Sequence, residues 1–224
     1  ISRRLEYYCK DLEVFFKASQ EFAEGAGLLP LAMQKVGDAP VVDGKLDDKS
    51  WERATPNAFV RATDRTTKEP KYPSEVRAVW TLDGVYLGFK LSEPTPAKLE
   101  TTNGGTDNPS MWWDDNVEIL IDVTGHNDGE YYHLMFNTRD GRYDGKGKDL
   151  TWTCQGLKWA TQIGTDSWTL EVYLPYSAFP DAIKPGGGAI VAWTGNFTRH
   201  RVADSRAKTA DRTPGSSREY SRMN

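Results

Sequence analysis

The chain reads Val41-Val-Asp-Gly-Lys-Leu-Asp-Asp-Lys-Ser-Trp-Glu-Arg-Ala54 where its β-rich part is expected to begin. In this stretch Gly44 permits a tight turn, and Asp47 or Asp48 can cap a short helix. Trp51 can then anchor that helix in the core. We favour structural anchoring for this pattern over direct contact with a metal or a ligand.

The sequence after Pro40 consists of short runs with a period of two, divided by Gly, Pro, Asn and Asp. This pattern is typical of an all-β sandwich. Leu82-Asp-Gly-Val85 predicts a tight hairpin between the first two strands. The expected strands are Val76–Leu82, Val85–Leu91, Val117–Val123, Tyr131–Asn137, Leu157–Ile163, Trp168–Leu174 and Ile190–Thr198.

Alternation within these strands predicts what each face carries. In Val117–Val123 the odd-numbered residues are aliphatic, whereas Glu118 and Asp122 lie in the other phase, so a half-buried strand is expected. Polar side chains in the same phase of several strands form either a shallow charged groove across one sheet or its ordinary solvated face. These residues are Arg77, Lys90, Glu118, His133 and Glu171.

The first part of the chain has a helical pattern instead. From Ile1 to about Ala26 the apolar residues recur at alternating spacings of three and four, which predicts an amphipathic helix of about three heptads. Gly25 and Gly27 end it, and residues 28–37 are expected to form a linker. Such a helix packs on the sandwich, belongs to an upstream domain, or forms a coiled coil.

Three further segments follow the opening stretch in a fixed order. They are Trp112-Trp-Asp-Asp-Asn-Val-Glu-Ile-Leu-Ile-Asp122, Tyr131-Tyr-His-Leu-Met-Phe-Asn-Thr-Arg-Asp-Gly141 and Trp168-Thr-Leu-Glu-Val-Tyr-Leu-Pro-Tyr-Ser-Ala-Phe179. Together, the four segments resemble the family 9 carbohydrate-binding modules. The resemblance implies a jelly-roll-like antiparallel β-sandwich over residues 38–224. Residues 1–37 would be a helix and linker left from an upstream domain.

The resemblance also implies a function. Members of this family are non-catalytic accessory domains of secreted polysaccharide-degrading enzymes. We therefore expect the chain to bind a monosaccharide, an oligosaccharide or a polysaccharide. We also expect an upstream catalytic domain in the same longer chain, and an extracellular or periplasmic location.

Aromatic residues are the first candidates for sugar contact, because the family holds its sugar between two rings. Trp112 or Trp113 matches the first ring by order along the chain. Adjacent residues of an extended segment point in opposite directions, so one indole would be buried and the other exposed. Tyr220 is offered where the family places its second ring, usually a Trp in a loop after the last long strand. Family members also continue into a further short strand, and this chain ends at Asn224.

Polar residues near these rings would bind the sugar hydroxyls. Glu118 and Arg139 lie in the segments that supply such contacts in the family, and a carboxylate accepts where a guanidinium donates. Asn196 and Arg199 lie in the strand that supplies an amide contact. Each of these four residues could equally form a surface ion pair or end a strand.

Calcium is the cofactor that the resemblance suggests. The segment Asp122-Val-Thr-Gly-His-Asn-Asp128-Gly-Glu130 carries oxygen ligands of the kind that calcium prefers, with Asp122 and Asp128 as the expected ligands and Asp144 as a weaker one. Asn-Asp-Gly is also an ordinary hairpin turn that needs no ion. Both interpretations stay open at the level of sequence.

Composition argues against several other classes. The net charge is −4 and the basic residues form no stripe suited to nucleic acid. There is no apolar run of about 18 residues, so we expect no membrane span, and any export signal would lie upstream. The two cysteines, Cys9 and Cys154, show no metal-binding spacing, and a disulfide between them is possible on sequence grounds.

Three rival functions come from other classes. A haem module would need axial ligands on opposite sides of the iron, and His133 and Met135 project from one face of one strand. A glycosidase would need paired carboxylates such as Glu118 and Glu171. A packing sandwich without sugar affinity would serve only an upstream domain, and the Tyr at position 220 favours this third alternative.

Overall fold

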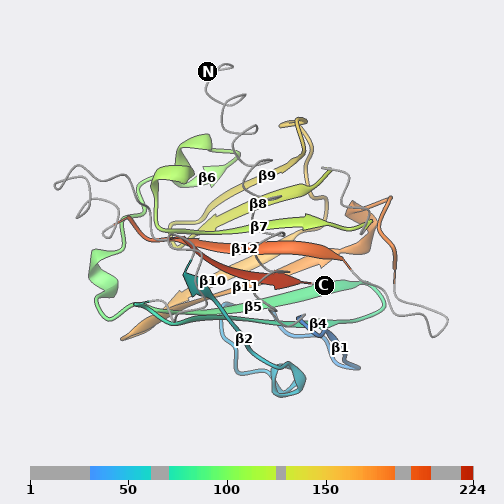
Figure 1. Ribbon diagram of the computed structural model, residues 1–224, viewed down its shortest axis with the longest axis horizontal. Coiled ribbons are helices and arrows are strands. Elements are labelled where there is room, and N and C mark those ends of the chain that lie inside the picture. The colour runs from blue at the N-terminus through green and yellow to red at the C-terminus, as the bar shows by residue number, and fades with distance from the viewer. Residues whose placement is uncertain (1–30, 62–70, 125–129, 185–192, 203–217, 224) are drawn as a thin grey trace.

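The computed structural model describes residues 31–61, 71–124, 130–184, 193–202 and 218–223. These residues form two β-sheets that face each other (Figure 1). Sheet A has the order β1-β4-β5-β11-β10, with β2 also paired to β4. Its strands are β1 (Gln34–Lys35), β2 (Asn57–Ala58), β4 (Ser74–Trp80), β5 (Gly84–Ser92), β10 (Lys158–Ile163) and β11 (Ser167–Pro175).

Sheet B has the order β3-β13-β12-β7-β8-β9-β6. Its strands are β3 (Val60–Arg61), β6 (Gly105–Thr106), β7 (Asn116–Asp122), β8 (Tyr132–Asn137), β9 (Gly141–Lys146), β12 (Thr194–His200) and β13 (Arg218–Met223). Neighbouring strands are antiparallel, apart from the short parallel pairs β1–β4 and β6–β9. The described residues also form 3₁₀ helices: η1 (Lys49–Arg53), η2 (Pro96–Lys98), η3 (Pro109–Trp113) and η4 (Tyr176–Ala178).

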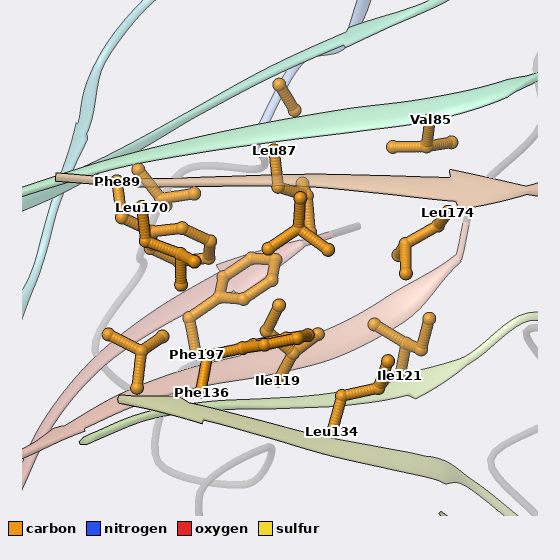
Figure 2. Close-up of a cluster of buried hydrophobic side chains, with 14 of the residues drawn as sticks. Val85, Leu87, Phe89, Ile119, Ile121, Leu134, Phe136, Leu170, Leu174 and Phe197 are labelled. Atoms are coloured by element: carbon orange, nitrogen blue, oxygen red, sulfur yellow. The ribbon is translucent and has the colours of Figure 1, made fainter. Parts of the chain in front are cut away.

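The core lies between the two sheets and is built by alternation. Figure 2 shows Leu87 and Leu170 from sheet A facing Ile119 and Phe197 from sheet B. Phe89 of sheet A and Phe197 meet edge to face, with ring centroids 5.5 Å apart, a geometry that the quadrupoles of aromatic rings favour. Burying these side chains is the main stabilising contribution to the fold. The predicted all-β antiparallel sandwich is therefore confirmed.

The opening stretch of the sequence is fastened to the outer face of sheet A. The Glu171 carboxylate accepts hydrogen bonds from the backbone N–H groups of Asp43 (2.9 Å) and Gly44 (2.8 Å) and from the indole N–H of Trp51 (2.8 Å). The Trp51 ring lies over Gly88, where a Cβ atom would come within 3.1 Å of it. Trp51 is only 1% exposed, so the predicted anchoring role is confirmed. Its cluster lies outside the space between the sheets.

The predicted strands agree with the observed ones to within a few residues where the structure describes them. The hairpin predicted at Leu82-Asp-Gly-Val85 joins β4 to β5, and the Thr81 N–H donates to the Gly84 carbonyl (2.9 Å). β9, a strand rich in Gly and charged residues, and β13 were not predicted from the sequence. β13 pairs with β12 and β3.

Two expectations from alternation are wrong. β7 is buried along its whole length, because its second face is also covered by side chains, including Trp112. The polar residues of the expected groove belong to different sheets. Glu118 and His133 lie on sheet B, whereas Arg77, Lys90 and Glu171 lie on sheet A. Alternation fixes a residue's face within its own strand, but only long-range pairing decides which sheet that strand joins.

The amphipathic helix expected at residues 1–26 lies outside the described residues, as does Cys9. Cys154 is a buried free thiol, and burial raises its pKa to about 12. None of the helices in the described residues is both long and apolar enough to span a bilayer.

Candidate functional site

The Trp112-Trp113 pair ends the short helix η3 at one edge of sheet B. Pro109 occupies its first turn, and the Asn108 side chain accepts a hydrogen bond from the Ser110 N–H (3.0 Å), as a capping residue does. Trp113 is 66% exposed, whereas Trp112 is half-buried. One indole is thus more buried than the other, but Trp112 is only partly buried, and a helical turn and not an extended segment separates the two rings.

Trp112 lies against the outer face of sheet B, the face turned away from sheet A. It packs on Leu120 and Tyr131, and its ring is nearly parallel to that of His200, with 24° between the planes and 6.5 Å between the centroids. The His200 ring is held in turn by a hydrogen bond between Nδ1 and the Asp114 carbonyl (3.0 Å). The Trp112 indole is therefore fixed by packing on several sides.

Glu118 and Asn196 lie on this same outer face. The strand register aligns Glu118 of β7 with Thr198 of β12, and Asn196 with Leu120. The Glu118 carboxylate accepts a hydrogen bond from the Thr198 hydroxyl (3.2 Å) and contacts His133 Nε2 (3.1 Å). Both Glu118 and Asn196 are buried. The structure thus brings three of the predicted residues, Trp112, Glu118 and Asn196, to one face.

Arg139 is exposed on the turn between β8 and β9, and a polar network ties this turn to η3. Asn137 Nδ2 donates to the Asp114 carboxylate (2.9 Å), and its Oδ1 accepts from the Arg139 N–H (3.0 Å). Asp114 also accepts from the Asn103 N–H (2.8 Å). Arg139 and Trp113 are therefore two exposed side chains on segments that are hydrogen-bonded to each other.

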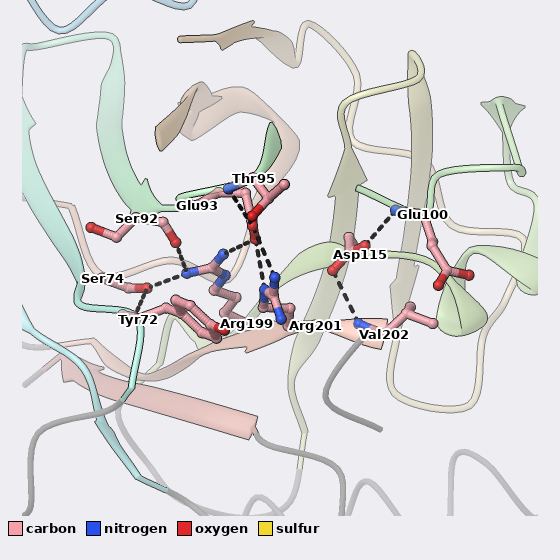
Figure 3. A network of polar contacts seen from close by, with 10 residues as sticks. All are labelled: Tyr72, Ser74, Ser92, Glu93, Thr95, Glu100, Asp115, Arg199, Arg201 and Val202. Carbon is pink, nitrogen blue, oxygen red and sulfur yellow. Dashed lines mark hydrogen bonds and ion pairs between the residues drawn. The ribbon is translucent and has the colours of Figure 1, made fainter. Parts of the chain in front are cut away.

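Arg199 takes a different place, because it shares the interior phase of β12 with Phe197. It is 2% exposed, and its guanidinium donates to the Ser92 carbonyl (2.8 Å) and the Glu93 carboxylate (3.3 Å) at the end of the sandwich (Figure 3). Arg201 donates to both oxygens of Glu93, at 2.6 and 2.9 Å. Burial raises the pKa of Glu93, but the hydrogen bonds from Arg201 and the Thr95 N–H and the charges of Arg201 and Arg199 together outweigh burial, so the net pKa is lowered. The structure does not bring Arg199 together with Trp112.

Asp115 belongs to the same region and fastens two backbone segments. Its carboxylate accepts from the Glu100 N–H (2.6 Å) and the Val202 N–H (3.0 Å) (Figure 3). Burial nevertheless dominates and raises the pKa of Asp115 to about 6. Sequence reasoning assigned no role to Asp114, Asp115 or Asn137. The sequence pattern that could have identified Asp114 and Asp115 is the Asp-Asp-Asn run, because Asp and Asn favour turns and caps.

The remaining predicted residues are only partly described. The backbone of Tyr220 lies in β13, paired with Thr198 and Val60, and not in a loop as expected. Asp122 ends β7, and its Oδ1 accepts from the backbone N–H (2.8 Å) and hydroxyl (2.7 Å) of Thr124. Asp128, the other expected calcium ligand, lies outside the described residues.

The part of the chain that the structure describes does not test the calcium prediction at Asp122 and Asp128. No group of three or more His, Cys, Asp or Glu side chains there could hold a metal ion. Asp144, the weaker candidate, is buried beside Arg142, with 3.2 Å between Oδ1 and Nε, an arrangement that suits an ion pair better than a cation site. A calcium site at Asp122 and Asp128 stays a prediction.

Comparison with known proteins places this arrangement in a family. The model of the carbohydrate family 9 binding domain-like family matches residues 42–209. The chain belongs to this family. Among curated proteins, none shows significant sequence similarity to it.

Solved structures similar to this family 9 domain show its fold. Two are complexes of a family 9 carbohydrate-binding module from Caldicellulosiruptor kristjanssonii. The complex with cellotriose has a TM-score of 0.58 and 17% identity, covering 86% of this chain and 84% of that chain. The complex with glucose has a TM-score of 0.57 and 17% identity, covering 84% and 85%. A protein from Bacteroides uniformis, described as a candidate carbohydrate-binding protein, has a TM-score of 0.59 and 17% identity, covering 87% and 90%.

The geometry of the domain bears directly on two rival functions. Glu118 and Glu171 lie on opposite outer faces of the sandwich, so they cannot flank one glycosidic bond. For haem, Nε2 of His133 faces Glu118, and Nδ1 of His200 faces the Asp114 carbonyl. Met111 and Met135 pack in one apolar cluster with Tyr143. These four residues are thus engaged in contacts within the protein.

Proposed function

We propose that this domain binds a saccharide without catalysis and that the sugar ring stacks on Trp112. One observation carries the proposal: the Trp112 indole is fixed on the sheet face that also holds Glu118 and Asn196. An indole presents an apolar surface to the C–H groups of a pyranose. Amide and carboxylate groups beside it suit the hydroxyl groups.

Trp112 is favoured over Trp113 because it is held in place before the ligand arrives. Immobilising a free side chain on binding costs about 0.5–1.5 kcal/mol. Trp112 has packing partners on the outer face of sheet B, whereas Trp113 is 66% exposed. Trp113 therefore serves as the matched control in an alanine test, since it is the same residue type at the adjacent position.

Glu118 is the acceptor that we propose for a sugar hydroxyl. Its carboxylate can accept hydrogen bonds, and Thr198 and His133 both lie within hydrogen-bonding distance of it. These neighbours hold the carboxylate in one orientation. Arg139, exposed on the adjoining turn, supplies a donor at the edge of the face.

Glucose and cello-oligosaccharides are the ligands to test first, because the similar family 9 module structures were determined in complex with glucose and with cellotriose. We further propose that the domain is an accessory of a polysaccharide-active enzyme, with the catalytic domain upstream in a longer secreted chain. Membership of a carbohydrate-binding family supports this role. Weak binding, with a Kd between roughly micromolar and millimolar, is expected for a small contact area.

Calorimetric titration with glucose, cellobiose, xylobiose and galactose tests the proposal. We expect saturable binding of at least one sugar, at least a tenfold loss of affinity in Trp112→Ala, and less than a threefold change in Trp113→Ala. Titration with the end-reduced form of the bound sugar then separates chain-end capture from binding along the chain. Absence of binding to every sugar would favour the packing role. Equal losses in the two variants would refute the assignment to Trp112.

A further inference from the structure

A second candidate site lies at the turn that joins β4 to β5. A pocket of about 480 Å³ is lined by Leu82 and Asp83 of this turn, by Tyr173 and Tyr176 near the junction between β11 and η4, and by Lys184. We call it the hairpin pocket. Its volume falls within the ~300–1,000 Å³ range of ligand pockets.

The hairpin pocket and the Trp112 face lie on opposite sides of the sandwich. Tyr173 shares the outward phase of β11 with Glu171, on the outer face of sheet A, whereas Trp112 packs on the outer face of sheet B. The two sheets, which pack roughly 10 Å apart, lie between the two places. One pyranose ring cannot contact both places.

The walls of the pocket are fixed by close backbone contacts. The Asp83 carbonyl accepts hydrogen bonds from the Tyr176 N–H (2.9 Å) and the Tyr173 hydroxyl (3.3 Å). Gly84 pairs with Pro175, and a Cβ atom at Gly84 would lie 2.7 Å from Tyr173 Cε2. Only glycine permits this approach, so the turn is held against the end of β11.

One wall of the pocket is aromatic and held in place. The Tyr173 ring packs against Tyr86, with centroids 4.7 Å apart and planes tilted by 32°. The Lys158 ammonium lies 5.8 Å from the Tyr173 centroid. Leu82, on the turn, is 75% exposed and adds apolar surface. The pocket therefore presents a rigid ring beside an aliphatic side chain.

The other walls are polar and carry both signs of charge. Asp83, Ser177 and Lys184 supply a carboxylate, a hydroxyl and an ammonium group. The Tyr176 hydroxyl is enclosed without a hydrogen-bond partner, and burial raises its pKa to about 12, so it is a neutral O–H group. Tyr176 also packs in the core cluster and against Trp193, so its hydroxyl belongs to the interior and is not offered as a ligand contact.

We propose that the hairpin pocket is a second saccharide-binding site, which takes one or two pyranose units with their C–H groups against Tyr173 and Leu82. A neutral polyhydroxylated ring suits this combination of an aromatic wall, hydroxyl groups and opposite charges better than an anion or a cation does. The site is independent of Trp112, so the domain would bind two sugars, or two segments of one polysaccharide.

Amide chemical-shift mapping with cellobiose at up to about 50 mM tests this site, because affinities near millimolar suffice for detection. The titration is run on the wild type, Trp112→Ala, Tyr173→Ala and the double variant. We expect the amides of residues 82–84 and 177 to shift saturably in the wild type and in Trp112→Ala. In Tyr173→Ala their apparent Kd should rise at least tenfold. Lys90→Ala, an exposed position on the same sheet, is the matched control and should leave the shifts unchanged.

Ser177→Arg supplies a variant that does not touch the core, because Ser177 is exposed at the pocket. The long side chain should block the pocket and abolish the same shifts, even if Tyr173→Ala fails to fold. Shifts confined to residues near Trp112 would overturn the hairpin pocket while supporting the first site. Shifts at residues 82–84 that persist in Ser177→Arg would also overturn it. If the amides of residues 82–84 shift in the wild type while those near Trp112 do not, the hairpin pocket is supported and the first site is refuted.

Discussion

Replacing Glu171 with Gln tests the inference that hydrogen bonds to Glu171 hold the stretch from Val41 to Ala54 on the outer face of sheet A. We call this set of hydrogen bonds the lock. In the wild type, one carboxylate oxygen accepts from two backbone N–H groups and the other from the Trp51 indole. A glutamine oxygen can keep the two backbone bonds. Its NH₂ group then faces the Trp51 N–H, so two donors oppose each other.

The expected cost follows from those contacts. Losing a hydrogen bond to a charged group costs about 1.5–3 kcal/mol, and leaving a buried donor unpaired costs about 1–3 kcal/mol. Burial raises the pKa of Glu171, which means that a charged carboxylate is unfavourable at this buried position. The neutral glutamine avoids that cost, and this offsets part of the lost hydrogen-bond energy. We expect a net loss of about 2–3 kcal/mol in the free energy of unfolding. For a domain of this size the midpoint then falls by about 5–10 °C.

Urea unfolding of the wild type, Glu171→Gln, Trp51→Phe and the double variant measures this effect and the coupling within the pair. The coupling free energy should be about 1–2 kcal/mol, because both substitutions remove the same hydrogen bond. Glu75→Gln is the control, since Glu75 forms a partly exposed pair with Arg77 on the same sheet and should change stability by less than about 1 kcal/mol. Additive effects of the two substitutions, or a loss of sugar affinity in folded Glu171→Gln, would refute the lock.

Further predictions concern pH, calcium and a close approach of the backbone. The pKa of Asp115 is raised to about 6 in the folded state. The folded state therefore binds more protons than the unfolded state between about pH 4 and 6, and the contribution of Asp115 to stability falls by up to about 3 kcal/mol as pH rises through that window. Urea unfolding from pH 4 to 7 should show this slope in the wild type but not in Asp115→Asn. Calcium at about 100 times its Kd should stabilise chelator-treated protein by about 2.7 kcal/mol in thermal unfolding. Asp122→Asn should abolish that gain, and no gain in the wild type would exclude the calcium site. Gly84→Ala should destabilise the domain by at least about 2 kcal/mol in urea unfolding. Gly37→Ala, where no atom lies within 4 Å of the added Cβ, should be near neutral.

Much of the sandwich could be predicted from the sequence because its core strands alternate regularly. Ile119 and Ile121 in β7, and Leu170 and Val172 in β11, point inward at every second position. β9 was missed because its burial rests on residues such as Gly145 and Asp144, which carry no hydrophobic signal. β13 lies in an Arg-rich segment whose pairing with β12 is decided by tertiary contacts.

Several residues of the candidate site could be identified from the sequence, but their arrangement in space could not. The Trp pair and Glu118 were identified, yet η3 was expected to be extended, although Pro109 after Asn108 is a pattern that favours a helical start. Arg199 lies two residues after the buried Phe197 on the same strand, so the alternation of β12 could have predicted that its side chain points to the interior. Its partner Glu93 is remote in sequence, so no local sequence pattern predicts their ion pair.

The residues that hold the opening stretch in place and the residues proposed to bind sugar lie on opposite sides of the sandwich. Trp51, Gly44 and Glu171 hold the outer face of sheet A, whereas Trp112 and Glu118 lie on the outer face of sheet B. Sites that share no contacts contribute to stability nearly independently. The lock can therefore persist while the residues around Trp112 change. For the same reason, loss of affinity in Trp112→Ala at unchanged stability would be evidence about the ligand site alone, and not about the fold that carries it.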